Sequence, residues 1–545
     1  MGLLTLVEDR PTPKAVYNWR VYACAAVASC ASMMIGYDSA FIGTTIALPS
    51  FTQAFKFSTM SADHLALVKE NIVSVYQAGA FFGSLMAYCT SYFIGRKWGL
   101  TFWSLVFCIG AAMTCAVQGP GLGLLIGGRV IAGLGVGGTS MIVPIYISEL
   151  APPAIRGRLV GMYELGWQIG GLVGFWINYG LSTTMAPSHK QWLIPFAVQL
   201  IPAGLLFIGS FWLHESPRWL INKNRRAQAL KNLQWIRQLP ADDIYIVEEV
   251  AFMDAAIAEQ EAAIGHGFWS PFKAVWYSRA LQWRFLLGTL LFMFQNGSGI
   301  NAINYYSPTV FKSIGIQGTN NSFLTTGIFG VVKTCITFVW LFILIDKVGR
   351  RNLLMIGGGG GAICMYIIGA YIKLAKFNTK NTKLSPGGVA AIFFFYLWTA
   401  FYTPTWNGTP WVLNSEMFDN NTRALGQASA AASNWFWNFL ISRFTSNMFL
   451  KMGRNGYGVY IFFASMMILS IIFVFFVVPE TKSVPLERMD RLFSIRPVRK
   501  AHKTVMAEVR AEEEDFRHDV DGAGLSIEKT NLEHVEKADH VHNRV

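Results

Sequence analysis

The amino-acid sequence predicts an all-α membrane protein with twelve transmembrane helices, arranged as two six-helix halves joined by a cytoplasmic helical linker. Three observations support this prediction. The 545-residue chain is strongly apolar, with 53% hydrophobic and only 14% charged residues. Its apolar runs match the roughly 20 residues that a helix needs to cross a bilayer. Charged signatures also recur in the same order in the two halves of the chain.

The apolar runs divide into two sets of six. The first set lies at 21–46, 71–93, 98–117, 123–148, 159–180 and 192–213, and the second at 285–306, 323–345, 353–373, 387–413, 424–447 and 457–478. The polar segment between the sets contains two amphipathic helical patterns. We therefore predict an N-terminal segment at 1–20, bundles at 21–213 and 284–480, the linker at 214–283, and a largely disordered cytoplasmic tail at 481–545.

Basic residues gather in alternate loops, which are expected to face the cytoplasm. They are Arg96 and Lys97, Arg156 and Arg158, Lys347, Arg350 and Arg351, and Arg423. Both termini are then cytoplasmic. Residues 1–20 lack the short apolar core and cleavage site of a secretory signal. The net charge of +13 mostly reflects this topology, and no basic soluble face indicates nucleic-acid binding.

Motifs for catalysis and cofactor binding are missing from the sequence. All seven cysteines fall inside predicted spans, and no Cys or His cluster has metal-ligand spacing. The five glycines at 357–361 lack the following Lys and Ser or Thr of a phosphate-binding loop, so close helix packing is their expected role. The sequence therefore predicts no enzyme activity, no cofactor and no metal.

An internal repeat relates the two halves. Glu149 and Arg156 are seven residues apart, as are Glu416 and Arg423. Two further signatures, at 95–97 and 215–218, recur at 349–351 and 480–482. In a membrane protein built from two related halves, the substrate site is expected between them.

Each repeated signature lies at a predicted cytoplasmic helix end, where carboxylates and guanidinium groups of neighbouring helices can form charge-assisted bonds. Such bonds would hold the cytoplasmic side closed and break when it opens. The alternative is that they only anchor the helix ends. The candidate cytoplasmic gate comprises Glu149, Arg156, Glu215, Arg218, Asp346, Arg350, Glu416 and Arg423.

The stretch 295–308 carries more amides than a membrane helix usually has. At 3.6 residues per turn, Gln295 and Gly299 lie on one face, with Asn301 and Tyr305 near it. That face is expected to meet a polar ligand. Two glycines and a proline weaken the helix here, and irregular backbone in a membrane survives where it lines a cavity or is buried in protein. The alternative is that the amides hold neighbouring helices together.

Five predicted spans carry an ionisable residue, namely Asp38, Arg129, Glu164, Lys333 and Arg443. An unpaired charge near a helix centre costs roughly 2.5–3.5 kcal/mol, so these groups must be paired, hydrated or neutralised. Arg129 is the candidate partner of Asp38. Separating the two would make Asp38 take up a proton, which suggests proton coupling; the alternative is a permanent structural salt bridge. Lys333 lies too deep to reach the surface and should point into the bundle.

Motifs over residues 30–485 resemble the sugar porter family of the major facilitator superfamily. They include residues 36–38, 128–129, 144–149, 156–157, 215–218, 295–308, 346–351, 410–411 with Glu416 and Arg423, 434–435 and 479–482. Within that family the chain most resembles the quinate permeases of filamentous fungi, notably at 9–14, 166–170 and 393–398. The resemblance implies the major facilitator fold, alternating access and proton symport of quinate, a cyclic polyol carboxylate, across the plasma membrane.

The resemblance also implies site residues. The family pattern carries sugar-contacting roles onto Gln295, Asn301 and Trp411, with the region of Asn434 near the site. The chain departs from the family at three places. Asn296 stands where the family usually has a second Gln in this span. Glu164 and Lys333 stand where hexose porters usually have Gln and Asn. Tyr92 and Phe93 replace an Asp and an Arg before Gly95. The last departure puts the first half's gate in doubt.

A neutral hexose has no use for an ammonium at binding depth, whereas a carboxylate gains a charge-assisted bond from it. We therefore expect Lys333 to contact the substrate carboxylate. Glu164 then pairs with Lys333 in the empty state or accepts a ring hydroxyl. The alternative is a structural pair of these two side chains without a ligand role. The predicted substrate site comprises Gln295, Asn296, Asn301, Glu164, Lys333, Trp411 and Asn434.

The sequence thus predicts a monomeric, proton-coupled importer of quinate or a close relative, with a small-molecule substrate, protons and the lipid bilayer as its partners. A second reading is a hexose or other neutral polyol porter of the same fold, in which the buried charges pair among themselves. A third is a transporter-like nutrient receptor, although the short soluble tail shows no folded module for signalling.

Overall fold

The computed structural model describes residues 12–265, 267–316, 318–340, 348–375, 385–418, 422–482, 484 and 488–511. The regular elements in these ranges are helices. Nine of the described helices, some made of two consecutive pieces, are long and apolar enough to cross a membrane. Helices α6, α13, α14 and α20 do not meet that criterion, and they carry many of the polar and charged side chains of the interior.

The first half contains seven long or paired helices. They are α1 (Trp19–Ile46), α3 (Ala62–Phe93), α4 (Arg96–Cys115), α5 (Leu122–Leu150), α6 (Arg156–Thr184), α7 (His189–Val198) and α8 (Leu200–Trp212), with the short α2 (Pro49–Ala54) after α1. Small residues let these helices pack closely. A Cβ on Gly36 of α1 would lie 1.9 Å from the backbone oxygen of Trp167 in α6, so only glycine allows this helix contact.

The second half repeats this plan with two broken spans. Its helices are α13 (Arg279–Gly297), α14 (Ile300–Ile314), α15 (Thr319–Val339), α17 (Arg350–Leu374), α18 (Pro386–Tyr402), α19 (Thr409–Met417), α20 (Arg423–Lys451) and α21 (Tyr457–Val477). The run predicted as one span at 285–306 is two helices, because Gly299 has a left-handed φ of 92° between them. A π-helical turn at Thr403–Asn407 separates α18 from α19.

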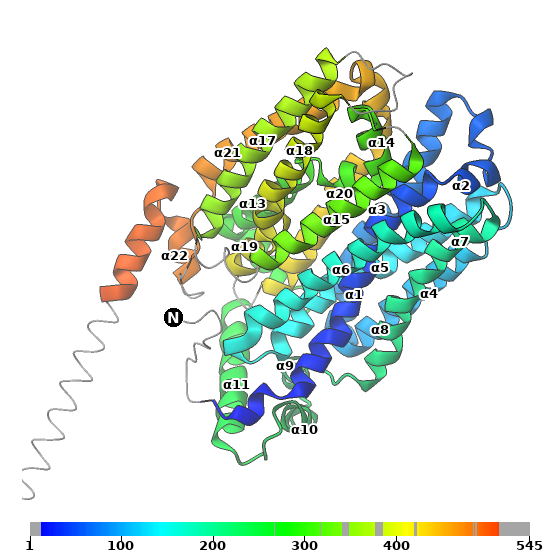
Figure 1. The fold of residues 1–545 in the computed structure, drawn as a ribbon. Helices are drawn as coiled ribbons and strands as arrows, with labels where there is room; N and C mark the ends of the chain where they lie inside the picture. Colours follow the sequence, from blue (N-terminus) through cyan, green and yellow to red (C-terminus); the bar gives the residue numbers. More distant parts are fainter. Residues whose placement is uncertain are drawn as a thin grey trace, which may run out of the picture.

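The linker forms helices α9 (Pro217–Asn222), α10 (Arg226–Arg237), α11 (Ile244–Ile264) and α12 (Ser270–Tyr277). The first three share a small apolar core that includes Leu220, Leu233 and Ile246. Arg237 ties this core to the bundle, since it pairs with Glu249 of α11 and donates to the backbone oxygen of Leu150. In Figure 1 helices α9, α10 and α11 lie together at one end of the bundle, opposite α2. We call this end the linker side.

The two halves meet along four helix pairs of the described chain, α1 with α14, α3 with α20, α5 with α20 and α6 with α15. Away from the linker side the approach of α1 to α14 is very close, because a Cβ on Gly43 would lie 2.0 Å from the backbone oxygen of Tyr305. Helix α3 begins nine residues before the run predicted from hydropathy. The predicted boundary is therefore wrong, and the helix includes one further buried charge, Glu70.

Candidate functional site

A small cavity lies between the halves, where α1, α6, α14 and α15 face one another. Its volume is about 10 Å³, which is room for a single water molecule and far below the usual range for ligand pockets. Small and apolar residues form most of its wall. Its polar side chains come from both halves, with Ser39 and Gln168 from the first and Asn304 and Lys333 from the second, and Trp167 adds an aromatic surface. In this state the cavity is too small for a ring-sized ligand, and it marks the place where polar side chains of the two halves face one another.

The Lys333 side chain is 5% exposed and lines this cavity. In the described part of the chain its ammonium forms no hydrogen bond and no ion pair within 4.0 Å. Glu164, the predicted partner, accepts instead from Gln168, at 2.8 Å, and from Asn407. The charges of Glu164 and Lys333 still act on each other over the longer distance. The direct Lys333–Glu164 pair expected as the alternative is therefore not formed in this structure.

Four of the predicted amides lie together but bond to the protein itself. Gln295 donates to the backbone oxygens of Trp406, at 2.9 Å, and Asn407, at 2.7 Å. Asn296 donates to the Asn434 side chain at 3.1 Å and accepts from Asn301. The structure thus brings Gln295, Asn296, Asn301 and Asn434 into one region, where their hydrogen bonds link α13, α14, α20 and the π-helical turn. Trp411 packs against Phe292 beside them, with ring centroids 4.7 Å apart.

Asn304 is a cavity residue that the sequence reasoning did not single out. Its side chain is 5% exposed, and its Oδ1 is buried without a hydrogen-bond partner. Its Nδ2 likewise has no bond within the described residues. The signal was present in the sequence, because Asn304 follows Asn301 by three residues and so lies near it on the helix surface. The structure adds that Asn304, rather than Asn301, faces the cavity.

Asp38 and Arg129 form the pair that was predicted. The guanidinium donates twice to the carboxylate, at 3.0 and 3.1 Å, and both side chains are almost fully buried. The Tyr76 ring covers the guanidinium, whose central carbon is 4.9 Å from the ring centroid. Asp38 precedes the cavity residue Ser39 on α1, and neither Asp38 nor Arg129 lines the cavity itself. A movement of α1 against α5 would change the ion pair and the cavity at once.

Helix ends on the linker side carry matching ion pairs in the two halves. Arg96 donates to Glu149 at 2.9 and 3.0 Å, and Arg350 donates to Glu416 at 2.9 Å. The first half therefore has this pair although Tyr92 and Phe93 replace the usual charges. The predicted gate set lacked Arg96, which supplies the partner of Glu149. Each pair joins helices of the same half.

Two further carboxylates cap helices at these ends. Glu215 accepts from the backbone nitrogens of Arg96 and Lys97, and Glu480 accepts from those of Arg350 and Arg351. Burial raises the pKa of Glu215, and its bonds from backbone N–H groups oppose the rise. Arg218 is also near, since its charge interacts with that of Glu149. Arg156 and Arg423 begin α6 and α20, and the predicted gate residue Asp346 lies outside the described residues.

Arg443, the fifth predicted intramembrane charge, pairs across the halves. It donates to the fully buried Glu70 of α3 at 2.7 Å. Asn447, one turn further along α20, donates to the same carboxylate from its backbone nitrogen, at 2.8 Å, and from its side chain, at 2.7 Å. Glu70 was missed because the predicted span began after it. The contact lies away from the linker side and closes α3 onto α20.

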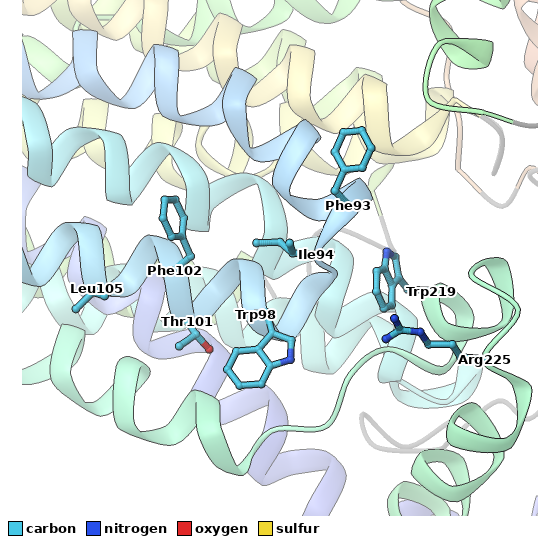
Figure 2. A pocket seen from close by; sticks show the side chains of 8 residues that line it. All are labelled: Phe93, Ile94, Trp98, Thr101, Phe102, Leu105, Trp219 and Arg225. Atoms are coloured by element: carbon cyan, nitrogen blue, oxygen red, sulfur yellow. The ribbon is translucent and has the colours of Figure 1, made fainter.

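A larger cavity opens on the outside of the first half, next to the linker (Figure 2). Apolar and aromatic side chains of α3 and α4 line most of it. Phe93 is 62% exposed and Trp98 51% exposed, which for a membrane-spanning bundle means that they face lipid. Trp219 and Arg225 of the linker region close one end.

The family model described as sugar (and other) transporter matches residues 24–493. A probable quinate permease of Neosartorya fischeri is 64% identical over 538 residues, covering 98% of each chain. The quinate permease of Neurospora terricola is 67% identical over 514 residues, covering 93% of this chain and 95% of that one. These relatives are transporters rather than enzymes.

Solved structures of transporters share the fold. The proton:xylose symporter XylE, bound to 6-bromo-6-deoxy-D-glucose, is 26% identical, with a TM-score of 0.71 over 87% of this chain and 99% of that one. An inward-open structure of XylE from E. coli is 27% identical, with a TM-score of 0.69 over 86% of this chain and 99% of that one. This likeness supports twelve helices in two halves.

Proposed function

Because this chain belongs to the sugar (and other) transporter family, we propose that it imports quinate, or a closely related cyclic polyol carboxylate, together with protons by alternating access. The observation that carries the substrate proposal is the Lys333 ammonium, which lines the cavity between the halves and has no bonded partner among the residues that the structure describes. A buried cation without a partner is costly. A substrate carboxylate would satisfy it with a charge-assisted bond.

In a wider state of the transport cycle, the other side chains that line the cavity suit the ring of such a substrate. The unbonded Asn304 amide can donate to and accept from ring hydroxyls, and Ser39 and Gln168 add further polar atoms. Trp167 offers an apolar face to the ring carbons. We propose that the predicted site residues around α13 contact the substrate in another state of the cycle, since their present contacts are to the protein. They are Gln295, Asn296, Asn301, Trp411 and Asn434. Glu164 then accepts a ring hydroxyl when its own bonds rearrange.

Proton coupling is assigned to Asp38 and Arg129. In the paired state the guanidinium satisfies the carboxylate, and separation of the pair would leave a buried carboxylate that binds a proton instead. XylE, one of the solved structures that share the fold, is a proton:xylose symporter. In this proposal the linker side is cytoplasmic, both termini lie in the cytoplasm, and the chain works as a monomer in the plasma membrane. The predicted gate residues lie at the helix ends on this side, where the Arg96–Glu149 and Arg350–Glu416 pairs hold helices of each half together.

The proposal is tested by uptake of labelled quinate into cells that express the chain, at acid and at neutral outside pH, with unlabelled shikimate or glucose as competitor. Acid-stimulated uptake that shikimate blocks and glucose does not is the expected result. Glucose transport without quinate uptake would instead favour the neutral hexose porter, for which the amide cluster around Gln295 would be the binding surface. Accumulation of label above the outside concentration would exclude a receptor that binds without transport.

A further inference from the structure

We propose that the cavity between α3, α4 and the linker binds an anionic phospholipid of the leaflet on the linker side. The cavity has the two chemically distinct ends that such a lipid requires. Figure 2 shows Arg225 and Trp219 at one end, and Phe102 and Leu105 further along α4, away from the guanidinium. A phosphate would bind at Arg225, and an acyl chain would follow α4 into the membrane.

The apolar end of the cavity faces the lipid phase. Phe93, Phe102 and Leu105 are between 42% and 62% exposed, although they lie on membrane-spanning helices. Trp98, also exposed, lies near the linker-side start of α4, where aromatic side chains typically meet the headgroup region. Lipid therefore covers this surface, and the charged end of the cavity determines which headgroup binds.

The charged end selects a negative headgroup. Arg225 is exposed and, within the described residues, has no ion pair or side-chain hydrogen bond. Two further cations border the cavity: Lys97 lies over the ring of Trp98, at 5.3 Å, and Lys223 over the ring of Tyr92, at 3.8 Å. No carboxylate is among the residues that line the cavity, and Glu215, at the start of α4, is occupied by the backbone nitrogens of Arg96 and Lys97. Basic pockets at the linker-side end of transmembrane helices are suited to anionic headgroups.

The neighbouring residue provides a matched control. Arg226 is also exposed, but it pairs with Asp254 at 2.8 Å and does not line the cavity. Purified full-length protein in nanodiscs of phosphatidylcholine, with increasing phosphatidylserine, would be compared for the parent, Arg225→Gln and Arg226→Gln. Retained lipid is measured by native mass spectrometry. We expect phosphatidylserine to be retained by the parent and Arg226→Gln, and about fivefold more weakly by Arg225→Gln.

A photoactivatable phosphatidylserine with its reactive group on the acyl chain tests the placement. We expect labelling of the peptide that carries Trp98 and Leu105, reduced by Arg225→Gln and by unlabelled phosphatidylserine. Equal retention by Arg225→Gln and the parent, or labelling elsewhere only, would overturn the proposal. Equal competition by the soluble headgroup glycerophosphoserine would show that the cavity binds free phosphate esters and not a lipid.

Discussion

Lys333 and Asp38 are both buried charges on membrane-spanning helices, but they differ in how the protein satisfies them. Arg129 meets Asp38 with two hydrogen bonds, whereas the Lys333 ammonium lines a cavity and has no bonded partner among the described residues. A satisfied pair is suited to a switch that breaks during the cycle. A buried charge without a bonded partner is suited to binding a ligand of opposite charge. The two residues therefore support different parts of the proposed function.

Replacing Lys333 by Met keeps most of the side-chain volume and removes the charge. We expect the apparent KM for quinate to rise about tenfold or more, because a hydrogen bond to a charged group is worth roughly 1.5–3 kcal/mol. Inhibition of quinate uptake by neutral cyclic polyols should change little. Uptake would be measured beside Lys312→Met, an exposed lysine on α14. An equal loss of affinity for charged and neutral ligands would contradict a carboxylate contact at Lys333.

Replacing Asp38 by Asn removes the group that is proposed to carry the proton. We expect quinate accumulation driven by acid outside pH to fail, since a carboxamide cannot exchange a proton in this range. Exchange of labelled for unlabelled quinate across the membrane should persist, because the cavity itself is unchanged. Both are measured in reconstituted vesicles. If accumulation in Asp38→Asn remained dependent on pH, the proton would have to be carried elsewhere.

At the scale of helices, the contact between α3 and α20 differs in kind from the ion pairs on the linker side. The Arg96–Glu149 and Arg350–Glu416 pairs each join helices of one half. Glu70 of the first half instead accepts three hydrogen bonds from Arg443 and Asn447 of the second half. The end of the bundle away from the linker therefore has a polar clasp between the halves, and this clasp must break if that end opens.

Replacing Glu70 by Gln should weaken this clasp and favour opening on the side away from the linker. Loss of a buried charged acceptor destabilises the clasped state by about 1–3 kcal/mol, which corresponds to roughly 5- to 150-fold more of the open state. The cavity is probed with a cysteine introduced by Ser39→Cys. A membrane-impermeant thiol reagent is added outside cells, and the rate at which it labels this cysteine is measured. The same chain without Ser39→Cys gives the background labelling. Asp63→Asn, an exposed change on the same helix, is the control. Equal rates in all three backgrounds would contradict a gating role for Glu70.

For the whole molecule, these contacts describe a transporter with a closed central cavity. Away from the linker, Tyr37 and Phe41 of α1 share an apolar cluster with Tyr305 and Tyr306 of α14. On the linker side, Ala428 and Ala431 of α20 pack into a cluster of the first half. Trp435 of α20 also donates to Ser140 of α5 at 3.1 Å. The halves are thus packed together on both sides of the cavity, which is small because it is enclosed.

The sequence by itself determined the twelve-helix plan, the two related halves and the residue types of the site. These features depend on hydropathy and on charges inside apolar runs, and both are local properties that a single chain displays directly. The pairing of Asp38 with Arg129 was also predicted, because a buried carboxylate needs a cation and few were available. Lys333 stands where hexose porters usually have a neutral Asn, and this difference indicated an acidic substrate.

Only the tertiary structure decided which polar side chains are satisfied. Gln295 and Asn296 read as ligand-facing amides, but they donate to the π-helical turn and to α20, more than 100 residues away. Asn301, read in the same way, donates to Asn296. The unbonded amide of Asn304 and the clasp of Glu70 with Arg443 and Asn447 likewise exist only once distant helices are packed. Hydropathy shows that a group is buried, whereas the packing of the two halves determines what it meets there.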